Sequence, residues 1–254
     1  MAATEQHLSQ AQRPSPLRSA EQWLIEASKL LFAIFCVGYA VMAFDYFIAF
    51  AAGREGLWLQ LLAVTVSSEF ALGPGSAHVE QHQAYAEALR FMLMHTTMGA
   101  VCLAIGPFQF VSSFRRNYAA AHRALGKIYL VSVLLSMFAG LGYLWVTPAT
   151  EVYSGVPFAL GLLGLDLMVI YSAVMAYNAI RRRDIFRHQA WMALNYALLL
   201  PTPVLRLFWI IFGVAFPSLD QEQANIAITT FLIPISALFG MIWIAAQRPT
   251  RQPA

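Results

Sequence analysis

The chain has 254 residues, of which 59% are hydrophobic and 11% are charged. Soluble domains carry roughly 25% charged residues, so the composition excludes an ordinary soluble domain and predicts a helical bundle in a lipid bilayer. The net charge of +3 comes from Lys and Arg clusters between apolar segments, which indicates membrane topology and excludes nucleic acid as the expected partner.

The first elements of the chain are a polar tail at residues 1–22, expected in the cytoplasm, and the apolar segments after it. Each long segment is close to the roughly 20 residues that a membrane-spanning helix needs. The predicted spans are 23–50, 87–112, 125–147, 157–180, 189–216 and 226–246. The sequence thus predicts an all-α integral membrane protein: a six-helix transmembrane bundle within residues 23–247, followed by a cytoplasmic tail at 248–254.

A shorter apolar segment, 57–66, is too brief to span a membrane. We expect it to lie along the outer membrane surface, with Trp58 at the depth of the lipid headgroups.

The basic residues mark one side of the predicted bundle. Most of the 16 Lys and Arg residues lie near the two termini and in the loops after the second and fourth spans, whereas the opposite loops are mainly acidic. Positively charged loops stay in the cytoplasm. We therefore expect a multi-pass protein of the bacterial inner membrane with both termini inside.

The two basic loops resemble each other. RRNYAAAHRAL begins at Arg115 and RRRDIFRHQAW begins at Arg181, an offset of 66 residues that aligns His122 with His188. Spans two and three and spans four and five then form two similar hairpins, which make a four-helix core. The alternative is that any hairpin with a positively charged tip carries paired arginines.

His122 and His188 are expected at equal depth, one to two turns inside helices that start after the caps Asn117 and Asp184. Two imidazoles on neighbouring helices suit the axial ligation of haem b iron, so His122 and His188 are candidate metal ligands. Guanidinium groups pair well with the haem propionates, and the candidates are Arg115, Arg123 and Arg182. The alternative is that both histidines contact lipid phosphate at the interface.

A second polar layer is expected toward the outer side of the membrane. Counting 1.5 Å per residue along each helix brings His95, Asp166 and Arg206 to similar depth, with Asp45 near the outer end of the first span. Ionisable groups inside a span are costly and are usually paired or functional. The cluster is therefore a candidate site, or alternatively an ion pair between Arg206 and one of the two aspartates that locks helices together.

Pro107 lies near the end of the second span. Proline leaves the carbonyl four residues earlier without its helical partner, so we expect a kink and a free carbonyl near Leu103. Gln109 then faces either a cavity or the membrane interface.

These positions carry a family pattern, which consists of HxxxG at 95–99, GPFQF at 106–110, HRxxGxxY at 122–129, and His188, Trp191 and Arg206. Over roughly residues 90–210 the pattern resembles the bacterial domain-of-unknown-function family 2306, described as predicted membrane proteins. Arg follows the second His in that family, and Gln189 stands here. The resemblance implies a membrane protein and no particular activity. More loosely, a four-helix core with His near its ends is similar to the two-haem cytochrome b superfamily.

Two functional hypotheses follow. In the first, the chain binds haem b and transfers electrons to quinone or to a redox partner protein, with the outer cluster handling protons or quinone. In the second, it is a non-enzymatic transporter or a membrane assembly or accessory factor. The sequence has no nucleophile elbow, P-loop, HExxH or dinucleotide fingerprint, which argues against soluble-type hydrolase or nucleotide chemistry. Whether the chain is an enzyme stays open.

Overall fold

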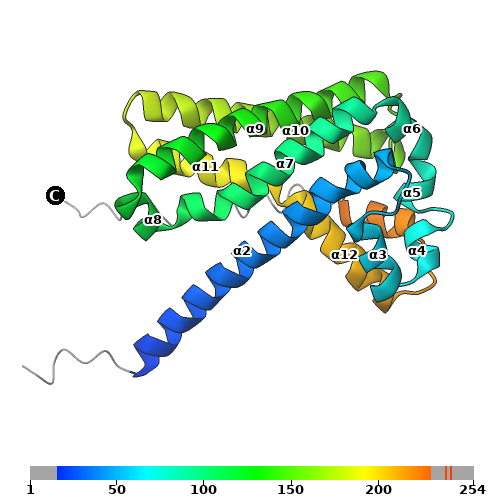
Figure 1. Cartoon of the computed structure of the whole chain (residues 1–254), viewed down its shortest axis with the longest axis horizontal. Coiled ribbons are helices and arrows are strands. Elements are labelled where there is room, and N and C mark those ends of the chain that lie inside the picture. Colours follow the sequence, from blue (N-terminus) through cyan, green and yellow to red (C-terminus); the bar gives the residue numbers. More distant parts are fainter. Residues whose placement is uncertain (1–15, 230–237, 239–240, 242–254) are drawn as a thin grey trace, which may run out of the picture.

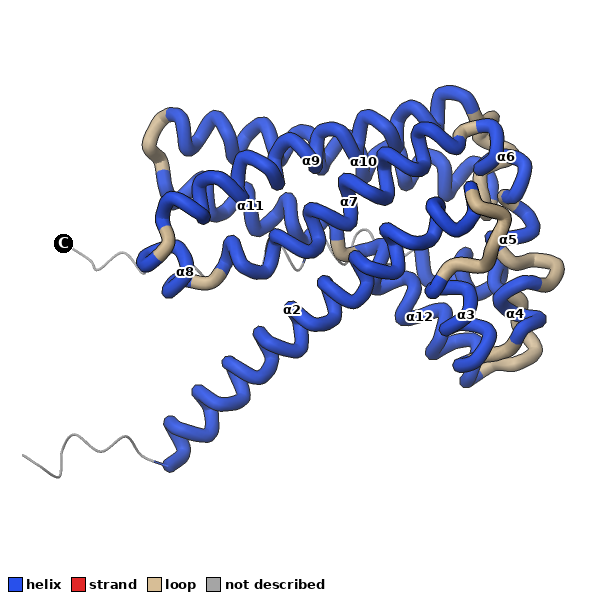
Figure 2. The backbone as a smooth tube through the Cα atoms, in the orientation of Figure 1, coloured by secondary structure: helices blue, strands red, loops and turns tan. Residues whose placement is uncertain are grey.

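The structure, a computed structural model, describes residues 16–229, 238 and 241, and every regular element in this part of the chain is helical (Figures 1 and 2). The long first helix, α2 (Pro16–Ala51), begins before the predicted first span, so residues 16–22 of the predicted tail are helical. The sixth predicted span, 226–246, lies largely outside the described residues.

Five helical segments of the described chain are long and apolar enough to cross a membrane. They are Gln22–Ala51 within α2, α7 (Leu89–Phe110), α9 (Ala119–Val146), α10 (Gly155–Arg181), and Ile185–Ala215, which consists of α11 (Ile185–Leu199) and α12 (Pro201–Ala215). Each matches one of the first five predicted spans. The fold is therefore all-helical with several apolar helices of membrane-spanning length, as the sequence predicted.

Helices α7, α9, α10 and α11 pack against one another in a ring. α7 packs against α9, α9 against α10, α10 against α11, and α11 contacts α7. It follows that α7 and α10 lie diagonally across the bundle, and so do α9 and α11 (Figure 1). α2 packs against α7 through its C-terminal part and diverges from the bundle toward its N-terminus. The internal repeat of two hairpins stays a prediction.

The two ends of the bundle differ. One end carries α8 (Ser112–Asn117) and the α10–α11 turn, with Arg115, Arg116 and Arg181 to Arg183 (Figure 1). We call it the basic end. The opposite end is covered by the short helices α3 (Leu57–Thr65), α4 (Ser68–Leu72), α5 (Ala77–Glu80) and α6 (His82–Glu87). We call these four helices the cap.

Within the cap, the side chain of Trp58 on α3 is buried in the protein. Trp58 is only 6% exposed and packs in one apolar cluster with Leu62, Phe70 and Trp209. Trp58 therefore packs inside the protein and does not face lipid headgroups, and the depth of segment 57–66 in the membrane stays a prediction. α4 and α12 pack against α3. The indole ring of Trp58 is therefore covered by apolar side chains of the protein.

Prolines shape two parts of the bundle, and the effect of Pro107 was predicted. α11 ends at Leu199 and α12 begins at Pro201, a favoured position for proline at the first turn of a helix. In α7, Pro107 leaves the Leu103 carbonyl available, and the Tyr196 hydroxyl donates to that carbonyl at 3.1 Å. A side-chain bond from α11 thus replaces the missing helical bond.

A polar network fastens the middle of the bundle. The buried Tyr129 hydroxyl on α9 donates to Asn195 Oδ1 on α11 at 2.8 Å. Asn195 Nδ2 donates in turn to the Val169 carbonyl at 2.8 Å and to Ser172 Oγ at 2.9 Å, both on α10. All these groups are satisfied, so the network fixes three helices without leaving a buried polar group unpaired.

Candidate functional site

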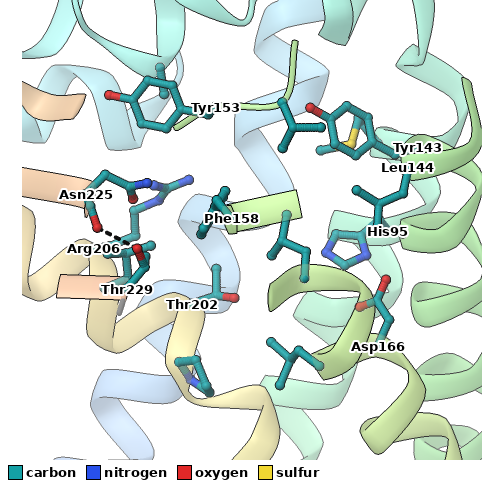
Figure 3. Close-up of a pocket in the computed structure, with 18 of the residues that line it drawn as sticks. His95, Tyr143, Leu144, Tyr153, Phe158, Asp166, Thr202, Arg206, Asn225 and Thr229 are labelled. Carbon is teal, nitrogen blue, oxygen red and sulfur yellow. Dashed lines mark hydrogen bonds between the residues drawn. The ribbon is translucent and has the colours of Figure 1, made fainter. Parts of the chain in front are cut away.

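A cavity of about 160 Å³ lies at the capped end of the bundle, with walls from α7, α9, α10, α12 and the cap. Its apolar walls include Phe158, Leu162 and Leu205. Its polar side chains, most of them labelled in Figure 3, are Tyr85, His95, Tyr143, Tyr153, Asp166, Thr202, Arg206, Asn225 and Thr229. Three of the four members of the predicted outer cluster thus line one cavity.

His95 and Asp166 approach each other inside this cavity from diagonally opposite helices, α7 and α10 (Figure 3), and in the described residues they are not within ion-pair distance. Gly140 of α9 makes room for them, because a Cβ there would lie 2.5 Å from Asp166 Oδ2 and 3.2 Å from His95 Nδ1. His95 Nδ1 also lies 2.9 Å from the Ser136 carbonyl oxygen. A carbonyl only accepts, so Nδ1 is the donor and Nε2 of the neutral ring keeps a lone pair.

Arg206 lies on the other side of the cavity from Asp166 (Figure 3). Its guanidinium carbon stands 3.8 Å from the centre of the Trp209 ring, a cation–π contact, and it also interacts with the Tyr39 phenol. Among the residues that the structure describes, no carboxylate lies within ion-pair distance of Arg206. The predicted ion pair of Arg206 with Asp166 or Asp45 is therefore wrong.

Asp45 does not line the cavity. Its carboxylate forms an ion pair with Arg54 and accepts a hydrogen bond from the Leu57 amide at 2.7 Å. The turn after α2 brings a guanidinium and a helix N-terminus to this carboxylate, which satisfies it there. Asp45 therefore fastens α2 to the cap and is not part of the outer cluster.

Two cavity residues have buried polar atoms without a partner in the described part of the chain: Trp209 Nε1 and Asn225 Oδ1. The side chains are 2% and 0% exposed. Asn225 uses only its amide nitrogen, which donates to Ser154 Oγ at 2.8 Å. Buried polar groups normally have partners, so the wall of this cavity holds one unused donor and one unused acceptor.

The sequence interpretation missed Trp209, Asn225 and Gly140. Trp209 could have been found, because it follows Arg206 by three residues and so lies on the same helix face. Asn225 lies near the start of the sixth predicted span and gives no periodic signal. The role of Gly140 depends on contact between three helices, which no local pattern encodes.

His122 and His188 lie at the basic end, at the first turns of α9 and α11. They are close enough to interact electrostatically. His188 Nδ1 donates to the Ala176 carbonyl at 3.0 Å, so its Nε2 keeps a lone pair. His122 Nδ1 and Gln109 Nε2 are buried and have no partner within the described residues. The diagonal helices α9 and α11 thus bring both imidazoles to this end, and α7 brings a buried amide.

The three arginines named as propionate partners differ in their surroundings. Arg115 donates to the carbonyls of Gln109 and Phe110, at 3.2 and 3.1 Å, and so caps the end of α7. Arg123 and Arg182 are exposed. Over the described residues, no group of three or more His, Cys, Asp or Glu side chains could hold a metal ion, so any metal here would depend on the two histidines.

Residues 92–244, more than half of the chain, match the family described as "Predicted membrane protein (DUF2306)". The chain belongs to this family. Comparison with curated proteins and with solved structures finds no match, so the looser resemblance to the two-haem cytochrome b superfamily gains no support. The DUF2306 match begins within α7 and includes His95, the basic-end histidines and the cavity residues of α10 and α12.

In this DUF2306 protein the two polar layers occupy opposite diagonals of one bundle. His95 and Asp166 use α7 and α10, while His122 and His188 use α9 and α11. The Tyr129–Asn195 network joins α9, α10 and α11 between these two layers along the bundle. The cavity layer combines a cation, a titratable pair and unused hydrogen-bonding atoms, which makes it the better-formed ligand site.

Proposed function

We propose that the chain is a transporter-like membrane protein that binds a small polar solute in the cavity and exchanges a proton with it through His95 and Asp166. One observation carries the proposal: the imidazole and the carboxyl group lie beside Gly140 in a cavity that also holds a guanidinium without a carboxylate partner in the described residues. Ionisable groups in a membrane bundle are costly, and they mark solute paths and proton relays.

The His95–Asp166 pair suits proton exchange in apolar surroundings. The Asp166 carboxylate or His95 Nε2 takes up the proton that the solute releases on binding, and it returns the proton when the solute leaves. The Ser136 carbonyl keeps Nδ1 protonated in both states, which leaves Nε2 as the atom that gains and loses the proton.

The experiment uses purified full-length protein in liposomes that enclose a pH-sensitive dye. Sugars, amino acids, carboxylates and phosphate are added separately, and we expect one class to drive a proton flux. Asp166→Asn keeps the shape of the side chain but cannot titrate, and it should lower the flux at least about tenfold. Asp184→Asn is the matched control, because Asp184 caps α11 at the basic end and Asn caps equally well. A wild-type flux in Asp166→Asn would contradict the proposal.

A second candidate function is haem b binding at the basic end, linked to electron transfer. It is favoured by His122 Nδ1, which lies near His188 and is buried without a partner in the described residues, and by Gln109 Nε2, which is buried and unpartnered among the same residues. His122 and His188 would hold the iron, and Arg123 and Arg182 would meet the propionates, since Arg115 is engaged with α7 carbonyls. Haem supplies one-electron chemistry.

In that case the electron partner would be a quinone in the cavity or a redox protein. An absorption spectrum of protein purified from haem-replete cells tests the candidate. A Soret band that both His122→Ala and His188→Ala abolish supports it, and a colourless, folded protein excludes it.

The basic end also supports a location. We infer that the protein lies in a bacterial inner membrane with both termini and the basic end in the cytoplasm, because basic loops are retained on that side. The cavity and the cap then belong to the outer half of the membrane and its periplasmic surface.

A further inference from the structure

We propose that the ligand of the cavity is a short carboxylate that carries a hydroxyl or ammonium group on the carbon next to the carboxylate. The inference rests on the proposed function in one respect only, that the cavity is a ligand site. It adds the chemical class, which follows from three features of the cavity: its charge, its unused hydrogen-bonding atoms and its size.

The charge of the cavity calls for an anion near Arg206. Asp166 lies across the cavity beside His95, and Asp45 is held by Arg54. Trp209 covers one face of the guanidinium, and the Tyr39 phenol interacts with it as well. A guanidinium has five N–H donors in its plane, so stacking leaves an edge for a ligand. A carboxylate matches that edge with two parallel hydrogen bonds.

The unused atoms define the rest of the ligand. Trp209 Nε1 can only donate, and Asn225 Oδ1 can only accept. Trp209 follows Arg206 by three residues on α12, and both line the cavity with Asn225. A carboxylate oxygen accepts from the indole, and a neighbouring hydroxyl or ammonium group donates to Asn225. A quinone offers acceptors only, and so it would leave Asn225 Oδ1 unsatisfied at a cost in affinity.

The size and the walls set the length of the carbon chain. The cavity holds about 160 Å³, and a buried apolar cavity of about 150 Å³ takes up a molecule the size of benzene. Phe158, Leu162 and Leu205 provide an apolar surface, which suits a short hydrocarbon chain and disfavours a bare inorganic anion. The ligand is therefore a short-chain 2-hydroxy or 2-amino acid.

The test measures binding to the purified full chain in lipid nanodiscs by titration calorimetry. The probe is 2-hydroxybutanoate. Its controls are 2-hydroxybutanamide, which has the same shape without the charge, butanoate, which lacks the hydroxyl, and inorganic phosphate. We expect 2-hydroxybutanoate, or its 2-amino counterpart, to bind at least about tenfold more tightly than every control.

Variants locate the binding within the cavity. Arg206→Gln should weaken binding of the carboxylate at least about thirtyfold, and Trp209→Phe, which keeps an aromatic face but loses the N–H, about fivefold. Gly164→Ala on α10 is the control for folding and should bind normally, because a Cβ at Gly164 meets nothing within 4 Å. Calorimetry is run only on variants whose thermal midpoint stays close to that of the wild type.

The results separate the two proposals. Equal binding of the amide and the carboxylate, unchanged binding in Arg206→Gln, or tighter binding of phosphate would overturn the carboxylate assignment. Absence of binding by both the 2-hydroxy and the 2-amino acid would overturn it as well. Carboxylate binding without any proton flux would leave this inference standing and remove the proposed function. Proton flux driven by a different solute class would support the proposed function and overturn the assignment of a 2-hydroxy or 2-amino acid as the ligand.

Discussion

A methyl group at residue 140 tests whether His95 and Asp166 really meet at the centre of the cavity layer. In Gly140→Ala the new Cβ would lie 2.5 Å from Asp166 Oδ2 and 3.2 Å from His95 Nδ1. The carboxyl group has to move, and overpacking of this kind costs about 1–3 kcal/mol. Replacing glycine by alanine within a helix stabilises the folded state by about 0.5–1 kcal/mol. We therefore expect a net loss of up to about 2.5 kcal/mol together with loss of proton exchange.

The assay is equilibrium unfolding of the purified variant in mixed micelles, followed by helical circular dichroism. Gly164→Ala is the matched control, since it makes the same change within α10 where the space is open. It should be neutral or more stable than the wild type by up to about 1 kcal/mol. Gly140→Ala could instead match Gly164→Ala in stability and retain proton flux. In that case His95 and Asp166 do not both lie against Gly140, and they do not act together in proton exchange.

Three further predictions test other parts of the structure. Gly106→Ala should destabilise by about 1–3 kcal/mol in the same unfolding assay, because its Cβ would lie 1.9 Å from a Tyr196 ring carbon; wild-type stability would contradict that packing. Reporter fusions should read as periplasmic at Thr150 and cytoplasmic at Asp184, and a cytoplasmic signal at Thr150 would refute the topology. Burial, followed by the charge of neighbouring His82, lowers the pKa of His78. Stability should therefore be full above about pH 6.5 and fall as the pH drops below it, with a shallower slope in His78→Gln; an unchanged slope would argue against this burial.

The arrangement of the helices along the chain could be predicted because each span is a long apolar segment. The depth of His95, Asp166 and Arg206 followed from the rise per residue alone, and one cavity holds all three. Asp45 could not be placed in this way. Its environment depends on how the turn before the cap folds back, and that turn brings Arg54 to the carboxylate.

Rotation of the helices about their axes was harder to predict than their bounds. Lipid-facing and core-facing residues are both apolar in these spans, so periodicity gives little contrast. The contact of Tyr129 with Asn195 and the approach of Tyr196 to Gly106 were therefore missed.

Local signals were more reliable where one side chain decides the geometry. Asp184 caps α11 as predicted, with its carboxylate accepting from the Arg187 amide at 3.0 Å. Asn117 does not cap α9, because residues 112–117 form α8 and Tyr118 occupies the cap position.

The most direct test of the central claim is a count of protons taken up or released when the solute binds. Purified protein in a weakly buffered nanodisc suspension is titrated with the solute that drives the largest flux, and a pH-sensitive dye reports the change. The account predicts an exchange of about one proton per protein in the wild type and none in Asp166→Asn, with normal exchange in Asp184→Asn. Equal exchange in the wild type and in Asp166→Asn would show that the proton comes from elsewhere and would contradict the account.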